Sequence, residues 1–156
     1  MSSSSKDLHD QRRNYVRDEL TEKKISPNPY KQFGRWLEEA AAGEILEPTA
    51  MVLSTADKNG KPSSRVVLLK AFNENGFIFY TNYNSRKGKE ISENNFASLL
   101  FFWDKLERQV RIEGTLEKID TQLSEKYFLS RPPQSQLSAI VSAQSEEIPS
   151  REYLED

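Results

Sequence analysis

The chain has 156 residues, 36% hydrophobic and 29% charged, with a net charge of −2 at pH 7; this predicts one domain and gives no indication of a nucleic-acid partner. Without cysteine, and with His9 as the only histidine, disulfides and thiolate ligands are excluded, and neither a metal site nor a Ser-His-Asp triad is expected. No apolar run reaches the roughly 18 residues of a membrane span and no signal peptide is visible, so we expect a cytoplasmic protein with a borrowed cofactor.

The N-terminal part is predicted to be helical after a polar tail. Residues 1–8 are Ser-rich and are expected to be disordered, and residues 7–20 are predicted to form a short helix. A second helix is expected to begin at Pro29, with Asn28 as its N-cap, and to end at Gly43.

The middle of the chain is predicted to be β-rich. Its apolar and alternating runs indicate five strands, at 49–55, 63–72, 77–82, 96–103 and 108–119. The pair Asn59-Gly60 is a strong hairpin signal between the first two strands. A short basic helix is expected at 85–94, with Ser85 as its N-cap.

The C-terminal part is predicted to return to helices. One helix is expected at 121–130, a second at 135–145 beginning with Ser135, and a third opening at Ser150. Five strands without closure would leave an exposed sheet edge, so residues 9–156 are expected to be a single domain that is incomplete at its C-terminus. The fold class is mainly β with flanking helices, as in a small barrel or sandwich.

The segment "SSRVVLLK" (63–70) places a cation at each end of an apolar strand. Regular pleating puts Arg65 and Lys70 on opposite faces, and apolar residues on both faces predict a strand between two layers with its cations near the rims. Two anionic ligand groups would explain the cations, and so would salt bridges to acidic residues.

Two further segments could hold phosphate. In "TNYNSRKGK" (81–89), hydroxyls and the cations Arg86, Lys87 and Lys89 gather at a helix N-terminus, which favours anions; a solvated basic turn is the alternative. In "KYFLSRPPQSQ" (126–136), Tyr127 and Arg131 share a helix face and a helix start follows. The alternative there is an arginine that complements the helix dipole, with an ordinary N-cap serine.

Four segments together resemble the pyridoxamine 5′-phosphate oxidase family: "RVVLLK", "FYTNYNSRKGKEI", "LLFFWDKLERQVRIEG" and "KYFLSRPPQSQLSAIVSAQS". The resemblance runs in order from about Arg12 to the last residue. It implies an FMN-binding split β-barrel of Greek-key type with its last strands missing, and a homodimer with FMN between the subunits. The family's C-terminal Trp, its Arg for FMN and its Arg-x-His pair are absent from this sequence.

The resemblance also implies roles for individual residues. Cofactor-binding positions are Arg65, Val66, Val67, Leu68, Leu69, Lys70, Tyr80, Thr81, Arg86, Lys87, Gln109, Gln144 and Ser145. Substrate-binding positions are Arg12, Tyr15, Lys70, Tyr127, Arg131 and Ser135. Of the cofactor positions, Gln109, Gln144 and Ser145 are expected to come from the partner subunit.

The implied activity is FMN-dependent oxidation of pyridoxamine or pyridoxine 5′-phosphate by O2 to pyridoxal 5′-phosphate, with release of H2O2. The flavin would carry the chemistry, so no catalytic side chain is assigned. Two alternatives stay open, namely another split-barrel flavoprotein such as a flavin reductase, and an FMN- or pyridoxal-phosphate-binding fragment without turnover.

Overall fold

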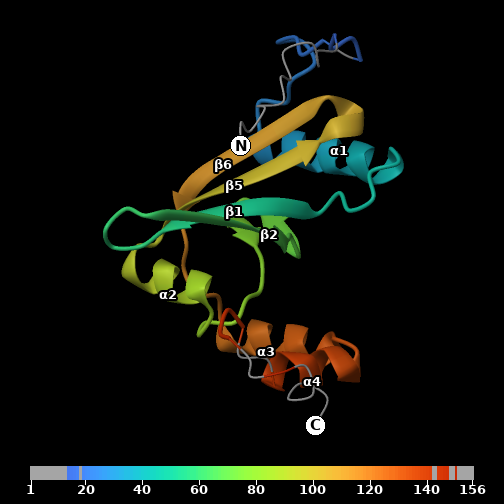
Figure 1. Ribbon diagram of the computed structural model, residues 1–156. Helices are drawn as coiled ribbons and strands as arrows, with labels where there is room; N and C mark the ends of the chain where they lie inside the picture. Colours follow the sequence, from blue (N-terminus) through green and yellow to red (C-terminus); the bar gives the residue numbers. More distant parts are fainter. Residues whose placement is uncertain (1–13, 18, 142–143, 148–149, 151–156) are drawn as a thin grey trace, which may run out of the picture.

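A computed structural model describes residues 14–17, 19–141, 144–147 and 150, and arranges them as β-sheet with flanking helices (Figure 1). The helices are α1 (Pro29–Ala42), α2 (Arg86–Glu93), the 3-10 turn η1 (Asp104–Leu106), α3 (Thr121–Ser130) and α4 (Pro133–Val141). The strands are β1 (Ala50–Ala56), β2 (Pro62–Leu68), β3 (Ala71–Asn73), β4 (Gly76–Ile78), β5 (Phe96–Trp103) and β6 (Arg108–Thr115). Three predictions fall outside the described residues: the tail at 1–8, Arg12, and the helix that was predicted to open at Ser150. Of that helix, the structure describes Ser150 alone. Within the described ranges, every helix is too short or too polar to span a bilayer.

The strands form two antiparallel sheets. The larger sheet has the order β2-β1-β5-β6, and β3 pairs with β4 in the smaller one. Register within the larger sheet aligns Arg65 with Leu53, and Leu53 with Leu99. Because successive side chains alternate between faces, these three residues share one face of the sheet.

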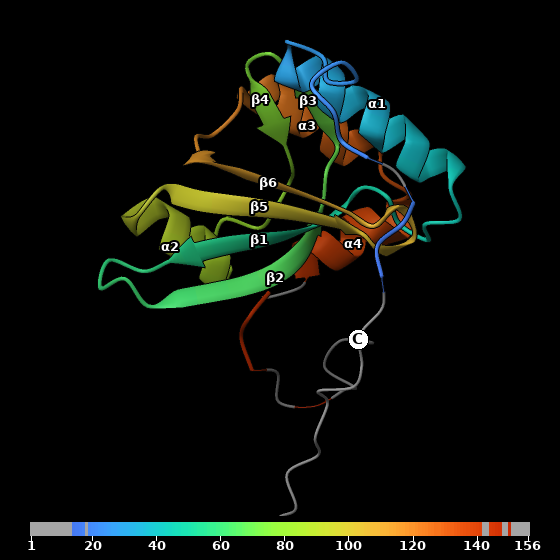
Figure 2. The ribbon, with the colours of Figure 1, turned by 90° about the horizontal axis from the view of Figure 1, so that it is seen from above.

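That face is covered by helices and holds the core. Phe33 of α1 makes edge contacts with the ring of Phe101 on β5, with centroids 5.1 Å apart, and α2 lies at the other end of the same sheet (Figure 2). The cap of α1 is as predicted, since the Asn28 side chain accepts from the Lys31 N–H at 3.0 Å. The buried hydrophobic residues are Phe33, Ala40, Met51, Leu53, Leu69, Leu99, Phe101, Trp103 and Leu106.

The opposite face of the larger sheet is open, which corrects the prediction of a strand between two layers. Val66 and Leu68 on β2 are 66% and 36% exposed, and Phe102 on β5 is 65% exposed. The described residues therefore cover only the Arg65 face of β2. Arg65 also lies in the middle of β2 instead of at a rim, because the strand already begins at Pro62.

The strand predicted at 63–72 is wrong in its length. The Leu69 N–H still bonds to the Thr49 carbonyl at 2.9 Å, but the Lys70 N–H bonds to the Ile78 carbonyl of β4 at 2.8 Å. The backbone thus changes sheets between these two residues, and β2 and β3 become separate strands. The strand predicted at 77–82 is shorter for a related reason, since its partner β3 has only three residues.

Two helix predictions also need correction. Residues 14–17 and 19–20 are not helical, because the N–H groups of Val16 and Arg17 bond to the Glu107 carboxylate at 2.9 and 3.1 Å instead of to helical carbonyls. The helix predicted from Ser135 begins two residues earlier, at Pro133. Proline suits the first position of a helix because it has no N–H to satisfy.

Candidate functional site

The N-terminus of α2 is shaped by a serine cap and a close backbone approach. Ser85 is fully buried, and its hydroxyl accepts from the Gly88 N–H at 3.3 Å and donates to the Asn82 carbonyl at 2.6 Å. A Cβ on Gly88 would lie 2.2 Å from the Tyr83 carbonyl oxygen, a separation that no side chain tolerates. Glycine at position 88 therefore allows the helix to start against the preceding loop.

Lys87 is a buried cation without a carboxylate partner among the described residues. It is 8% exposed, and its ammonium donates to the Gln144 side-chain oxygen at 2.7 Å and to the Ser85 hydroxyl at 3.3 Å. Burial lowers the pKa of Lys87, and the nearby Arg65 charge lowers it further. A buried charge is costly unless it is paired, so this position favours an anionic ligand.

Glu90 connects α2 to the larger sheet. Its Oε2 accepts from the hydroxyls of Thr55 and Ser63 at 2.5 and 2.6 Å and from the Arg65 guanidinium at 3.0 Å. Its Oε1 accepts from Arg86 Nε at 2.8 Å. Burial alone would raise the pKa of Glu90, but these hydrogen bonds outweigh it and lower the pKa to about 2. We call Arg65, Arg86, Lys87 and Glu90 the α2 cluster.

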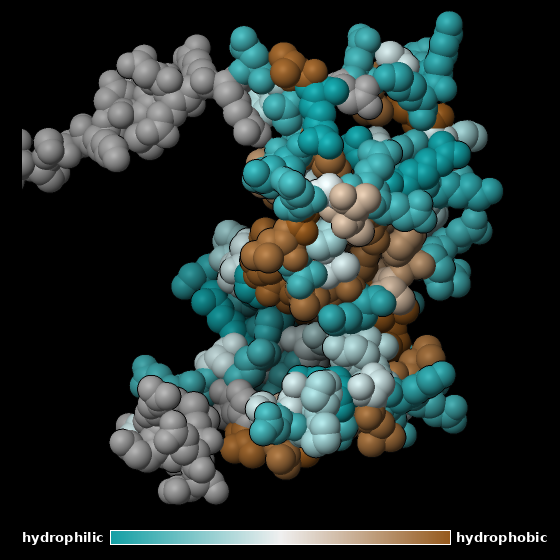
Figure 3. Space-filling view, turned by 90° about the vertical axis from the view of Figure 1, so that its right-hand side faces the viewer, coloured by the Kyte–Doolittle hydropathy of each residue, from teal (hydrophilic) through white to brown (hydrophobic). Residues whose placement is uncertain are grey.

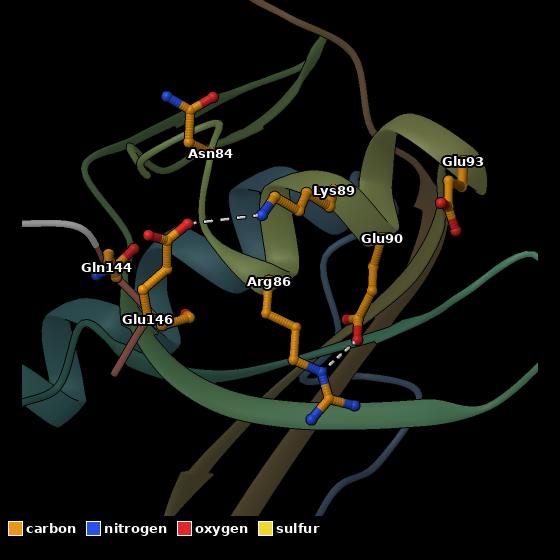
Figure 4. A pocket seen from close by; sticks show the side chains of 8 residues that line it. Asn84, Arg86, Lys89, Glu90, Glu93, Gln144 and Glu146 are labelled. Carbon is orange, nitrogen blue, oxygen red and sulfur yellow. Dashed lines mark hydrogen bonds and ion pairs between the residues drawn. The ribbon is translucent and has the colours of Figure 1, made fainter. Parts of the chain in front are cut away.

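A cavity of about 290 Å³ opens beside the α2 cluster. In Figure 4, Arg86 points toward Glu90, and Lys89 points toward Glu146, which it meets at 3.8 Å. The Thr81 hydroxyl, in the loop before α2, is buried and has no hydrogen-bond partner among the described residues, and buried polar groups without partners are rare. The lining residues are Asn84, Arg86, Lys89, Glu90, Glu93, Gln144, Ser145 and Glu146.

These features fit a phosphate-bearing cofactor such as FMN. Lys87 supplies a buried cation, Arg86 supplies an exposed guanidinium, and Thr81 supplies a hydroxyl that has no other partner. Charge-assisted hydrogen bonds to phosphate are among the strongest in proteins. The basic-turn alternative does not account for a buried Lys87 or an unpartnered Thr81.

Arg65 makes the salt bridge that the sequence left open as an alternative. Its NH1 donates to the Leu53 carbonyl at 3.2 Å and the Thr55 hydroxyl at 2.6 Å, and its NH2 donates to Ser63 and Glu90. All four terminal N–H bonds are therefore used within the protein. Lys70, by contrast, is exposed and has no side-chain partner among the described residues.

The glutamines expected from a partner subunit occupy different places. Gln144 contacts Lys87 of the same chain, and Ser145 follows it in the left-handed region at φ 74°. Gln109 is exposed, and it is paired with Phe102 on the open face of the sheet, opposite to Arg65. A single chain thus brings Gln144 to the α2 cluster but cannot bring Gln109.

The predicted substrate residues are only partly assembled. The rings of Tyr80 and Tyr127 stack with centroids 3.7 Å apart. Arg131 caps α3 in an extended conformation instead of continuing the helix. Neither the Arg131 guanidinium nor the Ser135 hydroxyl has a hydrogen-bond partner within the described ranges. Arg131 does stand at the C-terminus of α3, as the helix-dipole alternative requires, whereas Ser135 lies inside α4 and is not its N-cap. Tyr15 is 74% exposed, and Arg12 lies outside the described residues.

Sequence reasoning missed Glu90 and Gly88. Glu90 stands four residues after Arg86, a spacing that predicts a helical ion pair, but nothing local shows that β1 and β2 supply three more donors. Gly88 inside a predicted helix is a signal of close approach. Both residues therefore carried a partial signal.

A family model described as pyridoxamine 5′-phosphate oxidase matches residues 37–156. A pyridoxine/pyridoxamine 5′-phosphate oxidase from Trichormus variabilis is 52% identical over 148 residues, covering 95% of this chain and 69% of that protein. The chain belongs to the pyridoxamine 5′-phosphate oxidase family. Its members are oxidoreductases, and a chloroplastic relative from Arabidopsis thaliana is 53% identical over 96% of this chain, which spans 28% of that protein.

Solved structures agree with this family and its split-barrel fold. PhzG from Burkholderia lata, in complex with tetrahydrophenazine-1-carboxylic acid, has a TM-score of 0.83 and 31% identity, covering 88% of this chain and 69% of that chain. An FMN-binding protein from Nostoc punctiforme, related to pyridoxamine 5′-phosphate oxidase, has a TM-score of 0.64 at 16% identity, covering 85% of this chain and 73% of that chain. The predicted fold class, mainly β with flanking helices, is confirmed.

Proposed function

We propose that the chain binds FMN and oxidises pyridoxamine or pyridoxine 5′-phosphate with O2 to pyridoxal 5′-phosphate, releasing H2O2, and ammonia from the amine. The observation that carries this proposal is Lys87 at the N-terminus of α2, a buried cation without a carboxylate partner in the described part of the chain. FMN, when bound, supplies the acceptor for the hydride that leaves the substrate.

The residues of this chain bind and orient in this proposal. Lys87 and Arg86 hold the flavin phosphate at the N-terminus of α2, where the helix dipole also favours an anion. Arg131, whose guanidinium has no protein partner among the described residues, takes the substrate phosphate together with Tyr127 and Ser135. Fixing both phosphates sets the distance between substrate and flavin, which is the positioning contribution to catalysis.

A second copy of the chain completes the site in this proposal. Gln109 lies on the open sheet face, which also exposes the apolar residues Val66, Leu68 and Phe102. Burying this face against a second copy would remove apolar surface from water and carry Gln109 toward the partner's flavin. Sedimentation of the flavin-loaded protein should show a dimer, and a tightly flavinated monomer would contradict the proposal.

The deciding experiment is an FMN titration followed by an oxidase assay that records pyridoxal 5′-phosphate and H2O2 together. It should be run on this chain and on a version extended to the length of the relatives. Arg86→Ala/Lys87→Ala should lower FMN affinity at least about tenfold, because each charged hydrogen bond contributes about 1.5–3 kcal/mol. Unchanged affinity in this variant would place the anion site elsewhere.

The same assays separate the two alternative functions. Flavin binding without product, in both the present chain and the extended version, would support the non-catalytic alternative. Oxidation of NADH or NADPH in place of the B6 phosphates would support a flavin reductase.

A further inference from the structure

The Glu90 carboxylate is the most heavily used side-chain acceptor at the site, although no predicted role includes it. It is 5% exposed and receives donors from β1, β2 and its own helix. Three of the donors reach Oε2, whereas the one donor to Oε1 from the described part of the chain is Arg86 Nε, at 2.8 Å. The two oxygens thus perform different tasks, one toward the sheet and one toward the cavity.

The two arginines that bond to Glu90 differ in how many of their N–H groups are used within the protein. Arg65 has all four terminal N–H bonds directed into the protein. Within the described ranges Arg86 is held through Nε alone, its side chain is 58% exposed, and its terminal nitrogens point away from Glu90 in Figure 4. Those two nitrogens have no hydrogen-bond partner within the described residues, and together they form a fork suited to bidentate phosphate binding.

We propose that Glu90 is a positioning residue for the flavin phosphate, an inference that rests on the proposed function. Its Oε1 fixes Arg86 by Nε, so that both terminal nitrogens face the phosphate. Its Oε2 keeps Arg65 directed into the sheet. Glu90 therefore sets the orientation of both arginines through different oxygens.

Glu90→Gln tests this division because an amide has one acceptor oxygen where a carboxylate has two. The amide oxygen will remain with the three donors at the Oε2 position. The amide nitrogen then faces Arg86 Nε, and two donors cannot bond to each other. Arg86 is released while the contacts with Thr55, Ser63 and Arg65 are kept.

The measurement is the ratio of FMN affinity to riboflavin affinity, since riboflavin lacks the phosphate. In Glu90→Gln the FMN affinity should fall about tenfold or more, the effect of losing one well-placed charged hydrogen bond, while riboflavin affinity stays unchanged. Glu39→Gln is the matched control, because it removes an ion pair of 2.7 Å with Arg108 elsewhere in the chain; its ratio should equal that of the wild type. Equal losses for both ligands in Glu90→Gln would show a merely structural role and overturn the proposal.

Two further measurements keep the test decisive if Glu90→Gln folds poorly. Arg86→Lys keeps the charge but has no Nε to be held, so it should lower the FMN-to-riboflavin ratio by a similar factor; an unchanged ratio overturns the proposal. In the ligand-free wild type, the Arg86 Nε–H should give a slowly exchanging NMR signal, and its absence would overturn the positioning role whatever the flavin does. If the Arg86 Nε–H signal exchanges slowly but the wild type binds FMN no more tightly than riboflavin, the proposed function is refuted, and the positioning role with it.

Discussion

The two predicted phosphate sites are built to very different degrees. At the N-terminus of α2, Ser85, Lys87 and Glu90 are buried, and Glu90 is joined to the sheet by short hydrogen bonds from Thr55 and Ser63. In the α3–α4 segment (121–141), no residue is buried. Helices α3 and α4 lie at the lower end of the molecule in Figure 1, and Figure 3 shows apolar side chains on the surface at that end. The exposed ones are Leu123, Leu129, Leu137, Ile140 and Val141.

This difference indicates when each site is assembled. The α2 cluster is held within one chain without a ligand, because Glu90 and Arg65 bond to β1 and β2, Glu90 holds Arg86, and Gln144 holds Lys87. The α3–α4 segment keeps Arg131 and Ser135 without partners in the described ranges, so its geometry depends on a ligand or a second chain. We therefore expect that substitutions which disturb the packing around α2 weaken flavin binding. Substrate binding should depend instead on single contacts, such as the one made by Arg131.

The largest expected effect comes from Gly88→Ala. The new Cβ would lie 2.2 Å from the Tyr83 carbonyl oxygen, so the loop and α2 must separate, at a cost of about 3 kcal/mol in the free energy of unfolding. FMN affinity should fall with it. Gly114→Ala is the control, because nothing lies within 4 Å of its Cβ. Equal urea midpoints for the two variants would refute the close approach.

Arg131→Ala is the corresponding test of the α3–α4 segment. In a protein extended to the length of its relatives, KM should rise by one to two orders of magnitude, consistent with about 1.5–3 kcal/mol for a charged hydrogen bond. FMN affinity should stay near that of the wild type. Titrations with FMN and with pyridoxal 5′-phosphate measure the two separately, and loss of flavin from Arg131→Ala would show that the two sites are not distinct.

Acid should destabilise the α2 cluster through Glu90. Its pKa falls from 4.5 to about 2 on folding, so the unfolded chain binds the proton more tightly. The stabilisation is present above about pH 4.5 and is lost as the pH falls through about 2, with a total on the order of 3 kcal/mol. Urea unfolding of the wild type and Glu90→Gln should give a difference that shrinks between pH 6 and pH 3. A difference independent of pH would contradict this.

Lys87→Met should move binding and stability in opposite directions. Removing the buried ammonium should lower FMN affinity about tenfold, while the ligand-free protein gains about 1 kcal/mol, because a charge without a carboxylate partner no longer has to be desolvated. Since burial lowers the pKa of Lys87, that gain should shrink as the pH rises and should vanish above about 10.5, where the lysine is neutral in both the folded and the unfolded state. Calorimetry at two pH values checks both signs, and a destabilised Lys87→Met would refute the argument.

The sequence predicted local features well and non-local ones poorly. Helix α1 follows from Asn28 and Pro29, and β5 from an apolar run, since each depends on neighbouring residues. The sheet change at Lys70 was not predicted, because it is set by the Ile78 carbonyl of another strand. Likewise the cations of the α2 cluster were identified from their spacing, but the carboxylate that orients them was not.

The smallest expected effect lies where the two sites meet. Tyr80 precedes the loop into α2, Tyr127 belongs to α3, and their rings stack with an interplanar angle of 4°. Such aromatic pairs contribute about 0.5–1.5 kcal/mol beyond the area they bury, so a double-mutant cycle of Tyr80→Leu and Tyr127→Leu should show a coupling of about 1 kcal/mol in unfolding. If this stack sets α3 against the flavin site, Tyr127→Leu should also weaken FMN binding slightly, although Tyr127 is assigned to the substrate. Tyr30→Leu is the matched control, because its ring contacts Phe77 instead. Additive effects in the cycle would mean that the two sites are independent.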